Sequence, residues 1–149
     1  MTYLSHIKGS GIPLGKLIGL VNHHKERLLN QYLLPLDVTP AQFKVLAVIE
    51  FERMRSPVEI SKMLSIDCGS MTRMIERLIK KSLVEKTPNP DDKRGVLLHL
   101  TDSGSVLLDQ CVEIIERDVS PLLVSDLTPE EVEQLTHLLE RLIPSECQI

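Results

Sequence analysis

The chain contains no tryptophan, and aromatic residues make up only 3% of its 149 positions. Its core must therefore be aliphatic, and the wide spacing of Leu, Ile and Val favours helices over a β-sandwich. There is also no run of the ~18 to 20 apolar residues that a membrane span needs. The first residues, MTYLSHIKGSG, lack the apolar centre of a signal peptide. We expect one globular domain, residues 1–149, located in the cytoplasm.

Cysteine is scarce as well. Cys68, Cys111 and Cys147 lie far apart, are odd in number and show no CxxC spacing. This pattern indicates neither a disulfide framework nor a zinc site, and no other cofactor is expected. We expect free thiols, as in a reducing compartment. Cys68 or Cys111 would be open to oxidation if exposed, but buried and inert thiols are the simpler expectation.

The charges divide along the chain, although the net charge is only −4. Residues 53–95 hold ten Lys or Arg against six acids, whereas from residue 101 onward there are eleven acids and two bases. This division favours one region that faces an anion and another that faces solvent or a partner. Random surface patterning is the alternative.

Three helix starts share one pattern. VTPAQF at 38–43 and LTPEEV at 127–132 each place Thr at the N-cap, Pro next, and Gln or Glu at the third helical position, with apolar residues around them. RSPVEI at 55–60 repeats the pattern with Ser56 as the cap. We predict that a helix begins at the proline of each motif.

Two longer helices are predicted from apolar periodicity. Apolar residues recur every three or four positions from Pro13 to Leu34, which predicts an amphipathic helix over this stretch. Thr101 is placed to cap a second long helix, which Pro121 should stop or kink. The terminal helices are more apolar than a small monomer needs.

Residues 57–81 divide into two short helices joined by a turn at Ser65 to Asp67, with Asp67 placed as an N-cap. The predicted inward residues of the first helix are Val58, Ile60, Met63 and Leu64. Those of the second are Met71, Met74, Ile75, Leu78 and Ile79. The opposite face of the second helix presents hydroxyl and basic groups, from Ser70, Thr72, Arg73, Arg77, Lys80 and Lys81. These dimensions are those of a helix-turn-helix.

Such a face suits a groove of DNA. Arg73, near the start of the second helix, can donate a bidentate pair to guanine, worth ~1 to 3 kcal/mol of discrimination. The hydroxyls of Ser70 and Thr72 can reach phosphates or base edges. Lys80 and Lys81 lie too late on the helix for bases and would touch the DNA backbone. A solvated basic surface with an ordinary i, i+4 ion pair is the alternative.

A charged, turn-forming stretch, NPDDKRG at 89–95, lies between two strand candidates at 83–87 and 96–100. This arrangement predicts a β-hairpin directly after the second helix, stiffened by its prolines. A helix-turn-helix followed by such a hairpin is a winged helix. The predicted fold is therefore mainly α, with a winged helix-turn-helix over residues 38–100.

The tip of the hairpin is expected to contact DNA. Arg94 can enter the narrow minor groove, Lys93 can touch phosphate, and Asp92 can pair with Arg94 and orient its guanidinium. A surface hairpin with a weak salt bridge is the alternative. The full set of predicted DNA-binding residues is Lys62, Ser70, Thr72, Arg73, Arg77, Lys93 and Arg94.

The run DCGSMTRMIERLIKKSLVEKTPNPDDKRGVLLHLT resembles the multiple antibiotic resistance regulator (MarR) family, whose wing signature is Asp, any residue, Arg, and a strand ending in Leu-Thr. The resemblance extends to IPLGKLI and LDVTPAQFKVL and covers nearly the whole chain. It implies a homodimeric winged-helix repressor of antibiotic or stress resistance genes, with dimerisation helices at 12–34 and 102–144. Its two recognition helices would bind a pseudo-palindromic DNA operator.

The resemblance also implies release by small phenolic or aromatic acids, bound in a crevice near Pro57, Thr72, Arg77 and Lys86. Arg77 or Lys86 would pair with a carboxylate. Two positions depart from the family pattern. Ser82 stands where members commonly have Gly, and Lys80 stands where some carry a Cys, which argues against thiol sensing at that position.

An enzyme and a protein-binding winged-helix protein are the two alternative classes of function. An enzyme would need a nucleophile, a base and an orienting group at motif spacing, and the sequence has neither such a set, nor a Gly-rich phosphate loop, nor an HExxH motif. We therefore do not expect catalysis. A winged-helix protein that acts through protein–protein contacts remains the alternative to a DNA-binding regulator.

Overall fold

The structure is a computed structural model and describes residues 13–145. Its elements, in chain order, are α1 (Pro13–Leu33), η2 (Leu34–Leu36), α2 (Pro40–Phe51), α3 (Pro57–Leu64), α4 (Cys68–Lys80), β1 (Val84–Asn89), β2 (Asp92–Leu100), α5 (Asp102–Ile114), η3 (Ile115–Val119), α6 (Ser120–Leu123) and α7 (Pro129–Glu140). The two strands pair antiparallel. The predicted fold, mainly α with a hairpin wing, is confirmed.

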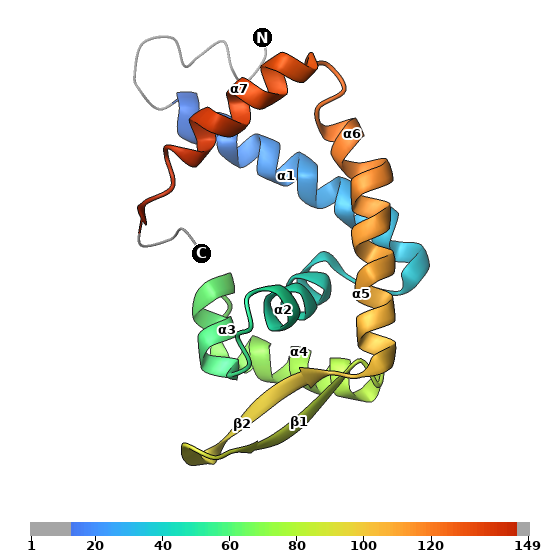
Figure 1. Cartoon of the computed structure of the whole chain (residues 1–149), viewed down its shortest axis with the longest axis vertical. Coiled ribbons are helices and arrows are strands. Elements are labelled where there is room, and N and C mark those ends of the chain that lie inside the picture. Colours follow the sequence, from blue (N-terminus) through green and yellow to red (C-terminus); the bar gives the residue numbers. More distant parts are fainter. Residues whose placement is uncertain (1–12, 146–149) are drawn as a thin grey trace.

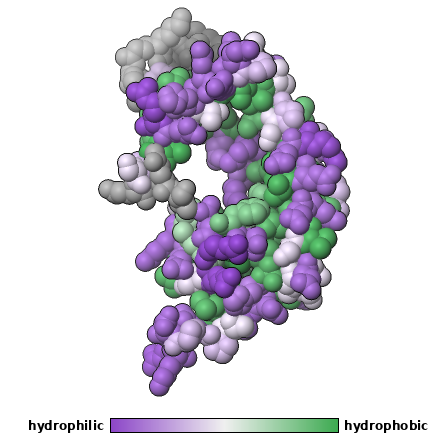
Figure 2. Space-filling model, in the orientation of Figure 1, coloured by the Kyte–Doolittle hydropathy of each residue, from purple (hydrophilic) through white to green (hydrophobic). Residues whose placement is uncertain are grey.

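The elements form two parts joined by a long helix (Figure 1). Helices α2, α3 and α4 and the hairpin make up one part, which we call the recognition end. Helices α1 and α7 lie at the other end, and we call them the apolar arm. Helix α5 runs between the two and contacts α1, α2 and β2. The space-filling view shows an opening between the recognition end and the arm (Figure 2).

Two aliphatic clusters form the core. The larger one lies inside the recognition end and is centred on the fully buried Leu46, Ile60 and Leu78. The smaller one lies where α1 meets α5 and η3, around Leu33. Helix α5 supplies a buried residue to each cluster, so packing of its side chains joins the two parts of the molecule.

The predicted helix starts are found, with one correction. Thr39 and Thr128 each form a complete capping box, and Thr101 caps α5. Helix α3 begins at Pro57 as predicted, but the side chain of Ser56 makes no cap hydrogen bond. Ser56 has the extended backbone of an N-cap residue. Because its side chain forms no cap bond, we attribute the start of this helix to Pro57, whose fixed φ is helical.

The inward face predicted for α3 is wrong in part. Ile60 is fully buried, but Val58 is 56% exposed and Met63 is 38% exposed, and Ser61 is buried in their place. Helix α3 has only 8 residues and packs against α2, α4 and β2. A helix this short buries a narrow stripe, and apolar type alone did not identify which residues form it.

Pro121 does not end the helix that starts after Thr101. The chain forms a π-helical turn, Ile115–Val119, and continues as α6 to Leu123. A proline inside a helix has no backbone N–H to donate, and its ring crowds the carbonyl four residues earlier. The wider π-helical turn before Pro121 accommodates both effects, so the helix is distorted rather than stopped.

The apolar arm exposes the side chains that would normally form a core. Exposed members on α1 are Leu14, Leu17, Ile18, Leu20 and Val21, and those on or after α7 are Leu135, Leu138, Leu139, Leu142 and Ile143. All of these residues except Leu20 and Ile143 line two hollows of about 390 and 450 Å³. The recognition end buries its apolar residues much better than the arm does.

Within residues 13–145, no single helix combines the length and apolar character needed to cross a membrane, although the bent pair Pro13–Leu36 and Pro40–Phe51 does so when taken together.

Candidate nucleic-acid interface

The turn between α3 and α4 is held by backbone and side-chain hydrogen bonds. Ser65 adopts a left-handed backbone (φ 54°) and ends α3, and the Ile66 amide donates to the Ser61 carbonyl. The Ser70 amide donates to Asp67 Oδ1 at 2.9 Å, which confirms Asp67 as the N-cap of α4. Hydrogen bonding from the Ser70 side chain and amide, with the nearby charge of Arg73, holds the pKa of Asp67 below its ordinary value. The carboxylate is therefore ionised where it compensates the helix dipole.

The outer face of α4 carries the predicted polar and basic groups. Met71, Ile75 and Leu78 are buried, as predicted. The residues that face solvent include Thr72, Arg73, Arg77 and Lys80, while Ser70 is half-buried. The solvent-facing basic stripe that the sequence predicts is therefore present on this helix.

Local hydrogen bonds orient the start of this face. Arg73 Nη2 donates to Ser70 Oγ at 3.2 Å, and Thr72 Oγ1 donates to the Cys68 carbonyl at 2.9 Å. The Arg73 guanidinium folds back over Gly69, where an added Cβ would lie 3.5 Å from Nη1. The ordinary i, i+4 ion pair of the alternative would join Glu76 to Lys80. It is not among the ion pairs formed in residues 13–145.

The hairpin is longer than predicted. The expected strands, 83–87 and 96–100, extend into the charged stretch, so that β1 ends at Asn89 and β2 begins at Asp92. Only Pro90 and Asp91 form the turn, and the register shifts next to it, between Pro88 and Asn89. Near the tip the side chains face solvent, so the strand shows no apolar alternation there and its sequence reads as a loop.

Asp92 positions the wing, but not in the predicted way. Its Oδ1 accepts the backbone N–H of Arg94 at 3.0 Å, and in the described chain no ion pair joins it to the Arg94 guanidinium. A short Asp side chain readily reaches the N–H two residues ahead, which makes an Asx turn. Asp92 therefore fixes the backbone at the tip. The side chains of Lys93 and Arg94 are exposed and form no ion pair within residues 13–145.

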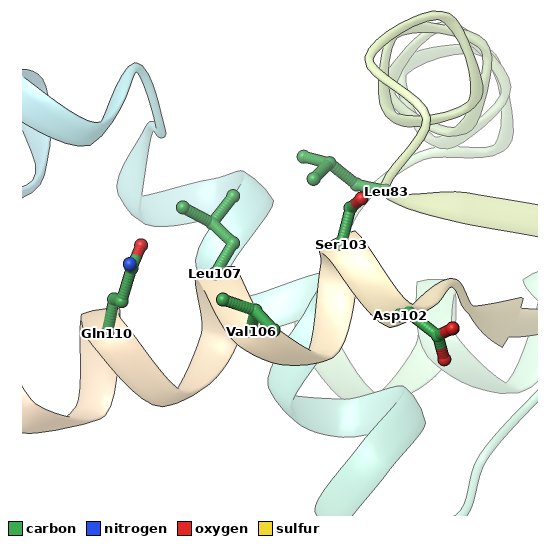
Figure 3. A pocket seen from close by; sticks show the side chains of 6 residues that line it. All are labelled: Leu83, Asp102, Ser103, Val106, Leu107 and Gln110. Atoms are coloured by element: carbon green, nitrogen blue, oxygen red, sulfur yellow. The ribbon is translucent and has the colours of Figure 1, made fainter.

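The remaining predicted residues lie apart from one another. Lys62 is exposed in the last turn of α3, Pro57 is half-buried at its start, and Lys86 is exposed on β1 opposite Leu98. No hydrogen bond or ion pair joins the predicted effector residues Pro57, Thr72, Arg77 and Lys86, so their grouping stays a prediction. A hollow of about 440 Å³ lies elsewhere, lined by Leu83 and by residues of α5, as Figure 3 shows.

Lys81 has a role that sequence reasoning missed. It was expected to touch the DNA backbone, but its Nζ donates to the Asp37 carbonyl and to Gln42 Oε1 within the protein. Gly104 was missed as well. A Cβ at this position would lie 2.0 Å from the Leu83 carbonyl oxygen. The signal in the sequence was a glycine in the first turn of a helix, a position that glycine disfavours without a reason in packing.

The cysteines differ in environment. Cys111 is buried, and burial raises the pKa of its thiol, as expected for an inert residue. Cys68 is exposed at the first position of α4, so the expectation of a buried thiol is wrong there. Cys147 lies outside the described residues.

Comparisons with known proteins agree with this geometry. A model of the MarR family matches residues 38–96. The chain is 50% identical over 133 residues to the multiple antibiotic resistance protein MarR of Escherichia coli (strain K12), covering 89% of this chain and 92% of that protein.

Solved structures add two further likenesses. A mutant MarR from E. coli complexed with operator DNA superimposes with a TM-score of 0.80 at 46% identity, covering 97% of this chain and 100% of that one. Bordetella bronchiseptica BpsR, a protein whose DNA binding is regulated by 6-hydroxynicotinic acid, superimposes with a TM-score of 0.75 at 27% identity. The match covers 87% of this chain and 97% of that one. This chain belongs to the MarR family and is a DNA-binding transcriptional regulator rather than an enzyme.

Proposed function

We propose that the chain is a homodimeric repressor that binds a pseudo-palindromic operator through α4 and the wing. The observation that carries this proposal is the placement of cationic side chains without ion-pair partners in the described chain. They lie on α4 and on the hairpin tip, at the same end of the molecule: Arg73, Arg77, Lys80, Lys93 and Arg94. Exposed cations gathered in this way attract the phosphate backbone even though the net charge of the chain is −4.

Each part of this face has a distinct task in the proposal. The start of α4 enters the major groove, where Arg73 reads a guanine edge and the hydroxyls of Ser70 and Thr72 contact phosphate or a base. Arg77 and Lys62 contribute backbone contacts. The complex of the E. coli relative with operator DNA supports this placement, because the two folds superimpose over almost the entire chain.

The wing supplies the second contact. Asp92 holds the backbone at the tip through the Arg94 amide, so the side chain of Arg94 leaves from a fixed point. We propose that Arg94 enters the minor groove, where the negative potential is strongest, and that Lys93 contacts phosphate. A preset backbone lowers the ordering cost of binding.

The apolar arm is the proposed dimer interface. Its exposed leucines and isoleucines form a continuous surface on α1 and α7 that a monomer would leave in water. A second copy covers such a surface at both subunits, which is the usual arrangement in symmetric dimers. Two copies also provide the two recognition helices that a pseudo-palindrome requires.

We further propose that a small phenolic or aromatic acid releases the operator of antibiotic or stress resistance genes. The effector would lie near Pro57 and Thr72, with its carboxylate on Arg77 or Lys86. A carboxylate on Arg77 would compete with DNA phosphate for the same guanidinium. The regulation of BpsR by 6-hydroxynicotinic acid supports an acid of this class.

The experiment is selection of bound duplexes from a random pool by the full chain, followed by titration of the selected site at several salt concentrations. We expect a palindromic consensus and a steep fall in affinity with salt, about 0.9 in log–log slope for each phosphate contacted. Adding a panel of aromatic acids should weaken binding. A protein that acts through protein–protein contacts would instead select no consensus and bind DNA weakly at every salt concentration.

A further inference from the structure

Lys81, the C-cap of α4, differs from the other cations of that helix. Its side chain is 31% exposed, whereas Arg73, Arg77 and Lys80 face solvent. Its ammonium group is used within the protein. It donates to the Asp37 carbonyl and to Gln42 Oε1, the latter at 3.3 Å, and its ion pair with the Asp37 carboxylate spans 3.4 Å. Its charge is therefore less available to DNA than that of its neighbour Lys80.

The acceptors of this lysine are themselves held in place. Asp37 follows η2 in a left-handed backbone (φ 56°), and its amide donates to the Leu34 carbonyl at 2.9 Å, so its own carbonyl is fixed relative to the end of α1. Gln42 is 6% exposed, and its Oε1 also accepts the Thr39 amide in the capping box of α2. One ammonium group thus joins the end of the recognition helix to the end of α1 and the start of α2.

The two residues that follow Lys81 are fastened to the other long helix. The Ser82 carbonyl accepts from Thr101 Oγ1 at 2.6 Å, and the Leu83 carbonyl accepts from the Thr101 amide at 3.1 Å. Gly104 allows α5 to approach this Leu83 carbonyl closely. Residues 81–83, at the end of α4, are therefore hydrogen-bonded both to the residues that follow α1 and to the residue that caps α5.

We infer that Lys81 is a positioning residue that sets the orientation of α4 relative to the apolar arm, and so the separation of the two recognition helices on DNA. The inference rests on the proposed function, because it needs a dimer that binds two half-sites. In such a dimer the arm fixes one subunit on the other, so a rotation of α4 relative to α1 moves the two helices apart or together. Half-site spacing is then a readout of this geometry.

Among the contacts of Lys81, the carbonyl and amide acceptors matter most. The Asp37 carboxylate is 93% exposed, and an ion pair with so exposed a partner contributes little. Lys81 also donates to the backbone carbonyl of Asp37. A substitution of the Asp37 side chain leaves this carbonyl in place. This difference supplies a control, because Asp37→Asn removes the charge of the carboxylate and keeps the carbonyl.

The experiment compares Lys81→Met with Lys80→Met in the full chain. Both variants remove one positive charge from the same end of α4 and keep a long unbranched side chain, but only the first removes the internal hydrogen bonds. Binding is measured on the selected operator and on operators whose half-sites are moved one base pair closer or farther apart. Circular dichroism at the assay temperature establishes that each protein is folded.

We expect Lys80→Met to weaken binding to all three operators by a similar factor. For Lys81→Met, the affinity for the native spacing divided by the affinity for an altered spacing should fall by about fivefold or more. Lys81→Arg, which keeps a cationic donor, should retain most of the ratio, and Asp37→Asn should retain nearly all of it. If Lys81→Met does not fold, Lys81→Gln takes its place in the same comparison.

An unchanged spacing ratio in folded Lys81→Met, with affinity lowered equally on all operators, would overturn the inference and leave Lys81 a purely structural residue. Failure of the proposed function looks different. In that case the wild-type chain itself would select no palindrome or would bind all spacings equally, before any variant is made.

Discussion

The recognition end and the apolar arm differ in which side chains they leave exposed to solvent. The recognition end buries a complete aliphatic core and leaves cations in solvent, whereas the arm leaves its leucines and isoleucines exposed and lines hollows with them. The first surface is stable as it stands and attracts an anion. The second gains free energy only when another apolar surface covers it. The first surface therefore suits the proposed DNA contact, and the second suits the proposed dimer interface.

The strongest test of this comparison breaks the junction between the two ends. In Gly104→Ala the new methyl group would lie 2.0 Å from the Leu83 backbone oxygen, which no side-chain movement relieves. We expect a loss of about 3 kcal/mol or more in the free energy of unfolding, measured by urea denaturation. Ser103→Ala, an exposed change in the same helical turn, is the matched control and should shift stability by no more than about 0.5 kcal/mol. Equal stability of the two variants would show that α5 does not approach the Leu83 backbone as described.

The next largest effect is expected in the arm. Leu139 lines both apolar hollows, and Leu139→Glu places a carboxylate in the surface that a second copy would bury. Desolvating it should cost roughly 3 kcal/mol, a factor of about a hundred in the dimer dissociation constant. Sedimentation equilibrium measures this constant. Glu133→Lys, an exposed change on the same helix, tests whether altered charge alone has the effect. A Leu139→Glu dimer as tight as wild type would place the interface elsewhere.

At the recognition end, Arg94→Ala should weaken operator binding by about tenfold without lowering the unfolding temperature. The Arg94 side chain is exposed and makes no ion pair in the described chain, so folding does not depend on it. Loss of one minor-groove or phosphate contact costs about 1 to 2 kcal/mol. Fluorescence anisotropy at fixed salt gives the affinity. Asp91→Ala, which removes a neighbouring acid, should not weaken binding, and wild-type affinity in Arg94→Ala would exclude the wing from the DNA contact.

A smaller effect separates two roles of Asp92. Its carboxylate accepts the Arg94 amide, and an asparagine side chain can accept the same hydrogen bond without the charge. We therefore expect Asp92→Asn to bind the operator within about twofold of wild type, whereas Asp92→Ala should lose about 0.5 to 1 kcal/mol of binding through a less ordered tip. Anisotropy titrations of both variants make the comparison. If Asn were as damaging as Ala, the charge and not the hydrogen bond would be what positions the wing.

The sequence predicted most of this arrangement because much of it is encoded locally. The capping boxes at Thr39 and Thr128 and the N-cap at Asp67 each depend on residues three positions apart, and all three are present. The basic face of α4 follows from helical periodicity in the same way. These features can be read from a single segment without knowing what packs against it.

What could not be predicted depends on contacts between distant segments. In the sequence Lys81 looks like one more cation of α4. Its internal hydrogen bond joins it to Asp37, 44 residues away in the chain, and only folding brings these two residues together. The exposure of Val58 depends on how α3 packs. The strands extend into NPDDKRG on either side of its Pro90–Asp91 turn because backbone pairing does not require apolar side chains. The effector residues remain a prediction for the same reason, since no local pattern specifies a crevice.

The smallest predicted effect concerns Ser82, where the recognition helix ends in a left-handed residue that is not glycine. Ser82 has φ 59°, and the Leu83 amide donates to Leu78 while the Ser82 amide donates to Ile79, the hydrogen bonds of a Schellman motif. Ser82→Gly relieves about 1 kcal/mol of backbone strain but adds flexibility to the unfolded chain, so we expect a net gain of only about 0.5 kcal/mol in urea unfolding.

Ser82→Ala keeps a Cβ at the same backbone position and should give no gain, which separates strain relief from loss of the hydroxyl. Ser82 directly follows Lys81, and its own carbonyl and that of Leu83 accept hydrogen bonds from Thr101. A more relaxed turn therefore also tests how rigidly the two ends are joined. If Ser82→Gly raised stability but left discrimination between half-site spacings unchanged, the turn would act only on folding. Reduced discrimination would instead show that the recognition end depends on a stiff junction to keep its orientation to the arm.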